Sequence, residues 1–294
     1  MKKLVLILTA IALLMSLPSC DKGEGENAEE IKESAKEKHT YVEGICTDCG
    51  ALKPSEGLEF KPVTDDNGDF IGYGVSVGSC TDTDLVFPTE HEGKPVIKVY
   101  YGGFEKLDTI TSVVIPEGYI SIDTGAFENC TSLASVTLPS TLERIENWSF
   151  KGCTSLKEIT LPEGFKTMGR GAFINCTSLE KVNFGGLETL EDEVFRGCTS
   201  LNSLVFPEGT TSIGGYAFDG CQNLYDMILP KSLTFIGAGA FNDCYSLINC
   251  KYSGTTAEFE AMEFGGALNN EEPIITSDGY IKRLYYKGSD EWFF

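Results

Sequence analysis

The sequence predicts an α/β solenoid dominated by β structure, in which short coils stack and share a parallel sheet. Phenylalanine recurs every 23 residues, with one spacing of 22 between Phe173 and Phe195. In six successive units a cysteine follows three residues later, and a leucine three residues after that. A fixed period of this length is typical of solenoids, whose units bury apolar side chains only against their neighbours. The recurring residues are Phe104, Phe127, Phe150, Phe173, Phe195, Phe218 and Phe241; Cys130, Cys153, Cys176, Cys198, Cys221 and Cys244; and Leu133, Leu156, Leu179, Leu201, Leu224 and Leu247.

Residues 1–19 have the pattern of a secretory signal peptide. Lys2 and Lys3 precede an apolar run, residues 4–14, that is too short to span a membrane comfortably. Shortly after this run, Leu17-Pro18-Ser19-Cys20 resembles a lipobox, with Cys20 as the lipidated first residue of the mature protein. The alternative is a soluble secreted protein that is cleaved elsewhere. No second run of about 20 apolar residues exists, so a lipid on Cys20 would be the only membrane anchor.

Residues 20–38 predict a flexible tether. Ile31 is the only large apolar side chain after Cys20, and such a segment buries too little surface to offset the entropy of ordering. We expect an exported, lipid-anchored envelope protein, exposed on the outer membrane. Acidic residues after the cysteine resemble surface-export signals, whereas Asp21 alone resembles an inner-membrane retention signal.

The segment 39–57 contains a C-x-x-C motif that could hold a metal ion. His39, Cys46 and Cys49 are three candidate ligands for a structural zinc, but such a site needs four. His91, Cys80 or a carboxylate would have to supply the fourth. A Cys46–Cys49 disulfide, favoured in an oxidising compartment, and two free thiols are the alternatives.

Each repeat, within residues 101–254, predicts one coil of the solenoid. In the unit 125–147, the spacing of Leu133, Val136 and Leu138 brings a turn residue and two alternate strand residues onto one side. Pro139 ends the strand, because proline cannot donate a ladder hydrogen bond. One repeat departs from this pattern, since it has Gly185 in place of the proline and is one residue short. We therefore expect an irregularity there.

The outward-facing strand residues predict two columns along one exposed sheet face. Stacked strands align these side chains, and extended faces of this kind are the surfaces with which solenoids contact partners. We expect this face to be concave. A solvated face without a partner remains the alternative, because the columns contain no aromatic cluster. The columns are Val114, Thr137, Thr160, Asn183, Val205, Ile228 and Lys251, and Ser112, Ser135, Glu158, Lys181, Ser203, Asp226 and Asn249.

The repeat resembles the BspA-type leucine-rich repeats of bacterial surface proteins. The resemblance is carried by Ala126-Phe127-Glu128-Asn129-Cys130-Thr131-Ser132-Leu133 and its later copies, and it covers residues 58–262. It implies a right-handed leucine-rich-repeat coil of the BspA/Treponema type, with an N-terminal β cap over residues 58–100 and a C-terminal cap over residues 255–294. It also implies adhesion or another protein-binding role, including host-matrix contact.

The six repeated cysteines are interpreted as core residues. Each takes the same inward position in its coil, where a small apolar side chain packs well. Metal or disulfide chemistry is the alternative.

The C-terminal cap is predicted to contain a helix and a hairpin. Thr255 to Phe264 reads as a short amphipathic helix that turns Phe259, Met262 and Phe264 towards the solenoid. Residues 273–286 alternate around Ser277-Asp278-Gly279, which indicates a hairpin. Such a cap would cover the open edge of the last coil.

Composition and motifs favour a binding protein over an enzyme. The net charge of −21 disfavours nucleic acid and anionic lipid as partners. Only two histidines exist, both outside the repeats, and no hydrolase, zinc-protease or phosphate-loop motif occurs. We expect a monomer, without a cofactor apart from the zinc considered above, that binds a protein. A glycan- or peptide-binding accessory of nutrient uptake and a structural envelope spacer are the alternatives.

Overall fold

The computed structural model describes residues 41–42, 44–47, 50–265, 274–275 and 281–282. The chain divides into two compact units, Met1–Pro54 and Ser55–Phe294, and each is described by itself. The signal peptide, the tether, Cys20, His39 and Cys49 lie outside the described residues.

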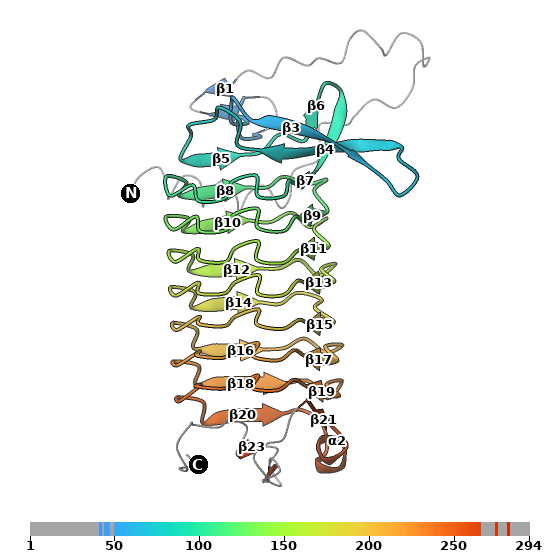
Figure 1. Cartoon of the computed structure of the whole chain (residues 1–294), viewed down its shortest axis with the longest axis vertical. Coiled ribbons are helices and arrows are strands. Elements are labelled where there is room, and N and C mark those ends of the chain that lie inside the picture. Colours follow the sequence, from blue (N-terminus) through green and yellow to red (C-terminus); the bar gives the residue numbers. More distant parts are fainter. Residues whose placement is uncertain (1–40, 43, 48–49, 266–273, 276–280, 283–294) are drawn as a thin grey trace. The chain divides into compact units, whose positions relative to one another are not determined.

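The second unit begins with a hairpin that passes into the coils. Strand β3 (Glu59–Thr64) pairs antiparallel with β4 (Phe70–Ser76), and β4 pairs parallel with β7 (Lys94–Val99). The short β6 (Glu90–His91) folds back on β7. Strand β7 then pairs parallel with β9, so the antiparallel hairpin serves as the first layer of the stack (Figure 1).

One side of the coils forms a continuous parallel sheet, here called the rear sheet. Each coil contributes only two residues to it, and successive strands pair without interruption. The inward member of each pair is apolar, and it is buried in every strand except the last, in which Phe264 is half-buried. Its repeat strands are β9 (Ser121–Ile122), β11 (Arg144–Ile145), β13 (Thr167–Met168), β15 (Thr189–Leu190), β17 (Ser212–Ile213), β19 (Phe235–Ile236) and β21 (Glu263–Phe264).

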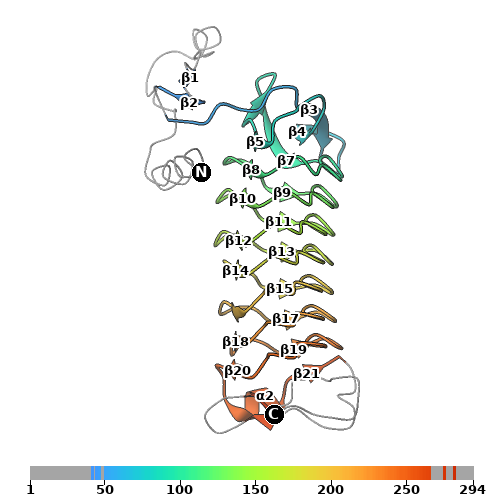
Figure 2. The same ribbon diagram turned by 90° about the vertical axis from the view of Figure 1, so that its left-hand side faces the viewer.

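A different side of the coils, here called the front face, carries longer strands in three separate ladders. The ladders are β5–β8–β10, β12–β14 and β16–β18–β20, so the single sheet expected on this face is interrupted twice. Figure 2 shows the two rows of strands on different sides of the coils. The front strands are β5 (Asp84–Val86), β8 (Ser112–Val114), β10 (Ser135–Thr137), β12 (Glu158–Thr160), β14 (Lys181–Asn183), β16 (Ser203–Val205), β18 (Asp226–Leu229) and β20 (Asn249–Tyr252).

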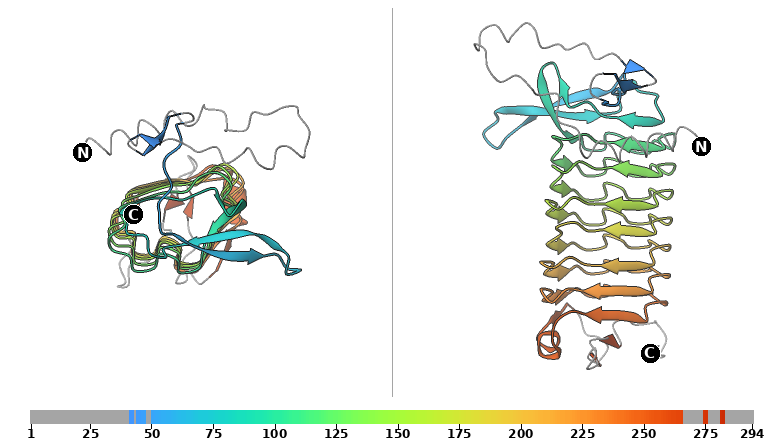
Figure 3. Two further views of the ribbon diagram at one scale, coloured as in Figure 1. Left: turned by 90° about the horizontal axis from the view of Figure 1, so that it is seen from above. Right: turned by 180° about the vertical axis from the view of Figure 1, so that it is seen from behind.

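The front face is straight, so the expectation of a concave face is wrong. The row from β8 to β20 follows a nearly straight line in Figure 1, and successive coils overlay in the view from above in Figure 3. The reason is that both rows consist of β-strands with the same neighbour spacing. Neither side of a coil is therefore wider than the other, and the stack has no cause to bend.

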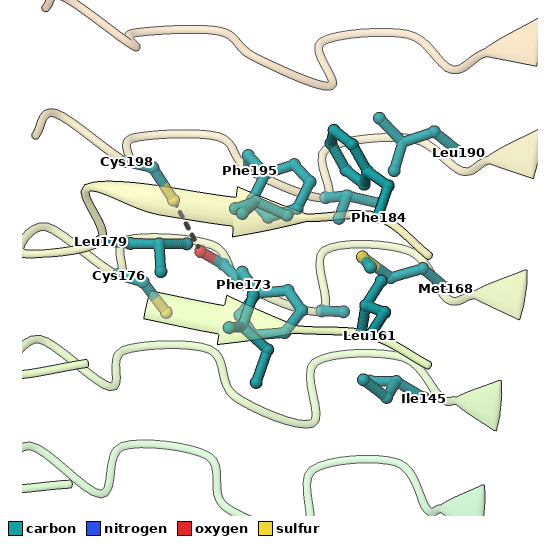
Figure 4. Close-up of a cluster of buried hydrophobic side chains, with 14 of the residues drawn as sticks. Ile145, Leu161, Met168, Phe173, Cys176, Leu179, Phe184, Leu190, Phe195 and Cys198 are labelled. Atoms are coloured by element: carbon teal, nitrogen blue, oxygen red, sulfur yellow. Dashed lines mark hydrogen bonds between the residues drawn. The ribbon is translucent and has the colours of Figure 1, made fainter. Parts of the chain in front are cut away.

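Phenylalanine rings form the centre of the shared core. All seven predicted rings are buried. Phe150 and Phe173 stack with centroids 5.1 Å apart, and Phe173 and Phe195 with centroids 5.4 Å apart. The rings lie between the two rows of strands, as the close-up in Figure 4 shows for Phe173 and Phe195. Because each ring packs against the coils on both sides of it, the core is continuous along the stack.

The six repeated cysteines, here called the ladder cysteines, are buried core residues as predicted. Each thiol also donates a hydrogen bond to the carbonyl oxygen of the phenylalanine in the preceding coil. The Cys198 Sγ lies 3.2 Å from the Phe173 carbonyl oxygen (Figure 4), and the Cys176 Sγ lies 3.1 Å from that of Phe150. This bond explains why cysteine occupies the position. Burial alone would suit alanine equally well, but alanine has no donor for the carbonyl oxygen.

The short repeat contains the irregularity that the sequence predicts. Gly185 has a left-handed backbone, with φ 57°. A Cβ there would lie 2.1 Å from the Pro162 carbonyl oxygen of the preceding coil. Phe184 fills the adjoining space by stacking on Phe206, with ring centroids 4.7 Å apart. The shortened turn therefore requires glycine for both its conformation and its close approach.

The C-terminal cap differs from the prediction in the length of its helix. Helix α2 spans only Thr256–Glu260, and a Thr255–Glu258 capping box fixes its start. Phe259 and Met262 are buried as predicted, but Phe264 belongs to β21 and extends the rear sheet by one strand. The pairing of β22 (Ile274–Ile275) with β23 (Ile281–Lys282) is antiparallel, as expected for a hairpin. Its turn residues lie outside the described residues.

Replacing Gly185 by alanine should destabilise the stack. Gly209→Ala is the matched control, because Gly209 also has a positive φ but has no atom within 4 Å of the added Cβ. We expect Gly185→Ala to lower the free energy of unfolding by about 1–3 kcal/mol more than Gly209→Ala, the usual range for overpacking. Urea denaturation followed by circular dichroism measures the difference. Equal losses in the two variants would contradict the close approach.

The ladder cysteines should resist alkylation in the folded protein. Burial raises the pKa of the Cys130 thiol to about 12, and it raises the pKa of the Cys176 thiol well above its ordinary value. The thiolate, which is the reactive form, is therefore scarce at pH values near 8. We expect iodoacetamide to modify the partly exposed Cys80 in the native protein and the ladder cysteines only after unfolding in guanidinium, as measured by peptide mass spectrometry. Native modification of Cys176 at the rate of Cys80 would refute the buried position.

Candidate interaction surface

The two predicted columns are aligned in register within each front ladder. Val114 pairs with Thr137, Thr160 with Asn183, and Val205 with Ile228. The last ladder continues from Ile228 to Lys251 and from Asp226 to Asn249. Asp84 and Val86 of β5 extend the columns by one strand. The sequence thus identifies which side chains share this face, although two interruptions separate the ladders.

Most of the fourteen column residues are exposed, and their polar groups bond mainly to one another. Ser112, Val114, Thr137 and Asn249 are half-buried, and the other ten are exposed. The amide nitrogen of Asn183 donates to the Thr160 hydroxyl at 3.0 Å, and that of Asn249 donates to the Asp226 carboxylate at 2.8 Å. Both bonds link neighbouring coils, and the exposed column residues of the first two ladders are all polar or charged.

The last front ladder is different, because apolar side chains gather on it. Val205, which is 62% exposed, lies beside the exposed Ile228. Tyr225 and Ile248, the latter 52% exposed, occupy equivalent positions just before β18 and β20. We call these four residues the C-terminal apolar patch. Sequence reasoning missed Tyr225 and Ile248 because they precede the strands. The change at this repeat position, from small or polar residues to large apolar ones, is the signal that could have identified them. The equivalent residues of the earlier coils are Ala134, Lys157, Glu180 and Asn202.

A carboxylate lies within this patch. Asp226 is on β18 between Tyr225 and Ile228, with its side chain exposed. Its carboxylate accepts a hydrogen bond from the Asn249 amide nitrogen at 2.8 Å, and the exposed Lys251 of β20 pairs in register with Ile228. The patch therefore combines apolar area with charged groups of both signs, Asp226 and the neighbouring Lys251.

The C-x-x-C segment forms a small hairpin in the first unit. Strand β1 (Tyr41–Val42) pairs antiparallel with β2 (Ile45–Cys46), and the Gly50 amide donates to the Cys46 carbonyl oxygen at 2.9 Å. Cys46 is buried. His39 and Cys49 lie outside the described residues, so the zinc site and its alternatives remain predictions. Within the described part of the chain, no group of three or more histidine, cysteine, aspartate or glutamate side chains is arranged to hold a metal ion.

The remaining features of the described residues concern membrane-spanning helices and the described histidine, His91. None of the helices among the described residues is long and apolar enough to cross a membrane. The imidazole of His91 stacks on the Phe60 ring, with centroids 3.9 Å apart, and therefore takes part in packing within the N-terminal β cap.

Solved structures of bacterial leucine-rich-repeat proteins resemble this chain. A leucine-rich-repeat protein from T. pallidum is 23% identical with a TM-score of 0.53, and the match covers 72% of this chain and 85% of that protein. A leucine-rich cell surface protein from Faecalibacterium prausnitzii is 19% identical with a TM-score of 0.35, covering 71% and 96%. The pneumococcal vaccine antigen PcpA is 20% identical with a TM-score of 0.39, covering 68% and 70%. No curated protein matches the chain.

The repeat pattern itself identifies the family. Six copies of the BspA type leucine-rich repeat region match residues 97–194 and 188–281, which together exceed half of the chain. These residues include the stacked phenylalanines, the ladder cysteines and the front face. The chain therefore belongs to the BspA-type leucine-rich-repeat family.

Proposed function

We propose that this protein binds another protein through the C-terminal apolar patch. The patch is the observation that carries the proposal: four large apolar side chains are exposed on or next to the last front ladder, whereas the exposed column residues of the earlier ladders are polar. Contiguous exposed apolar residues on a soluble domain mark contact sites, and aromatic anchors contribute much of the energy of such contacts. The repeat family supports a protein-interaction role in general.

The partner would lie outside the cell, in keeping with the N-terminal sequence. A signal peptide over residues 1–19, a lipid on Cys20 and the tether to residue 38 would place the coils at a distance from the membrane. We propose the outer membrane surface as the location and a host-matrix or cell-surface protein as the partner class. The net charge of −21 favours partners with a neutral or basic contact surface.

Glycan binding, as an accessory of nutrient uptake, is a second candidate with its own observation. Two aromatic side chains, Trp148 and Tyr216, are exposed in the loops that connect the rear sheet to the front face. Neither of them is among the four residues of the apolar patch, which lie on or next to the front strands β16, β18 and β20. The two candidates can therefore be separated by substitution.

The test uses the mature chain with Cys20→Ser. If Cys20 carries the lipid anchor, this variant should be found in the soluble fraction. This protein is applied to immobilised fibronectin, fibrinogen, laminin and collagen, and binding is measured by surface plasmon resonance. We expect at least one of the four proteins to bind. Failure of all four would contradict the host-matrix role and favour the envelope-spacer alternative.

The double substitution Val205→Ser and Ile228→Ser should weaken that binding by about tenfold or more, because it removes the centre of the patch. Both side chains are exposed, so the free energy of unfolding should change by less than about 1 kcal/mol. Ser135→Ala with Thr160→Ser, on the polar ladders of the same face, is the control and should leave the affinity unchanged. Equal binding by the apolar-patch variant and the unsubstituted protein would place the contact elsewhere.

A further inference from the structure

The position two residues before each stacked phenylalanine has a left-handed backbone in every coil. Glycine occupies four of these seven positions, and glutamate, tryptophan and tyrosine occupy the others. A bulky aromatic residue is an outlier in this conformation, because its Cβ crowds the following carbonyl oxygen. Backbone strain of this kind points to a functional role where the surrounding structure keeps the residue in the strained conformation. The seven residues are Gly102, Gly125, Trp148, Gly171, Glu193, Tyr216 and Gly239.

Both aromatic side chains rest on the glycine of the following coil. A Cβ added to Gly171 would lie 2.9 Å from Cδ1 of Trp148, and one added to Gly239 would lie 2.6 Å from Cε1 of Tyr216. One edge of each ring is therefore held against backbone. The two side chains remain 40% and 43% exposed, respectively. The same arrangement thus occurs twice, and in both cases an aromatic surface is held open to solvent.

The two rings are three coils apart on one side of the stack. Between Phe150 and Phe218, the centroids of neighbouring core rings are 5.1, 5.4 and 5.5 Å apart, so each coil advances by about one strand spacing. Three strand spacings correspond to about 14 Å, so Trp148 and Tyr216 lie roughly that far apart along the stack.

Polar groups line the space between and beside the rings. Arg170 and Glu193, from the two intervening coils, form an ion pair of 2.9 Å, and half of the Arg170 side chain remains exposed. The Asn242 amide lies beside Tyr216, since its Nδ2 would be 2.9 Å from a Cβ on Gly239. Guanidinium, carboxylate and amide groups can all form hydrogen bonds with hydroxyls.

We propose that this row is a binding site for a neutral β-1,4-linked oligosaccharide of at least four sugars, extended along the stack. Aromatic rings pack against the apolar C–H face of a pyranose, and the hydroxyls at its rim would bond to Arg170, Glu193 and Asn242. One sugar of an extended β-1,4-linked chain spans nearly the length of one coil, so sugars one and four meet the two rings. The net charge of −21 excludes uronic-acid and sulfated glycans as favoured ligands. This inference rests on the glycan-binding candidate of the proposed function, and its site is distinct from the C-terminal apolar patch.

Isothermal titration calorimetry of the Cys20→Ser chain with cellohexaose and chitohexaose tests the proposal. We expect at least one of the two to bind, and the one that binds more tightly identifies the sugar that the site prefers. Maltohexaose is the control: it has the composition and length of cellohexaose, but its α-1,4 linkages curve the chain away from the second ring. Cellotriose or chitotriose, too short to reach both rings, should bind about tenfold more weakly than the hexamer. Failure of both hexamers, or equal binding of maltohexaose, would overturn the proposal.

Trp148→Gly and Tyr216→Gly introduce glycine, the residue that four of the other coils have at this position. Because glycine adopts the left-handed backbone without strain, both variants should fold. Each should weaken hexamer binding by about fivefold to tenfold, and the double variant should abolish it. Tyr225→Ser, which removes an exposed aromatic ring from the apolar patch, is the matched control and should leave hexamer affinity unchanged. Conversely, the two glycine variants should leave protein binding unchanged, which separates this site from the proposed function. Unaltered hexamer affinity in the double glycine variant would refute the site.

Discussion

The structure depends on coils that have no interior until they stack. A coil of 22 or 23 residues cannot enclose its own apolar side chains, so each phenylalanine ring is buried only because the next coil covers it. The ladder cysteines reinforce this dependence, since each thiol bonds to a carbonyl oxygen of the preceding coil. Capping follows from the same constraint: an antiparallel hairpin covers the first coil, and α2 with β21 closes the last.

Because inward positions are fixed by stacking, the outward positions are free to differ from coil to coil. The front columns change from Ser135 and Thr137 in one coil to Asp226 and Ile228 four coils later, while the strands within each ladder keep one register. The loops that lead from the rear sheet back to the front face vary in the same way: one position with a left-handed backbone holds glycine in four coils and Trp148, Glu193 or Tyr216 in the other three. Two different surfaces therefore arise on one repeated scaffold.

The repeat period carried most of what the sequence could predict. Strict recurrence identified the core rings, the ladder cysteines, both front columns and the irregular turn at Gly185. The sequence did not predict the rear sheet, because strands of two residues are too short to show an alternating pattern. The straightness of the stack was therefore missed as well, since it depends on that sheet. The cap helix was predicted too long, because the spacing of Phe259, Met262 and Phe264 fits a helix, whereas Phe264 pairs with β19. Exposure of Tyr225 and Ile248 depends on where β18 and β20 begin, which periodicity alone does not define.

Native-state hydrogen exchange, followed by mass spectrometry, tests the shared core most directly. If stability is pooled along the stack, amides of β12 to β15 should exchange slowest and with one common free energy of opening, while those of β20, β21 and α2 should open at lower free energy. The contrary result would be a central coil, such as the one that contains Phe173, whose amides open independently while the coils on both sides remain protected.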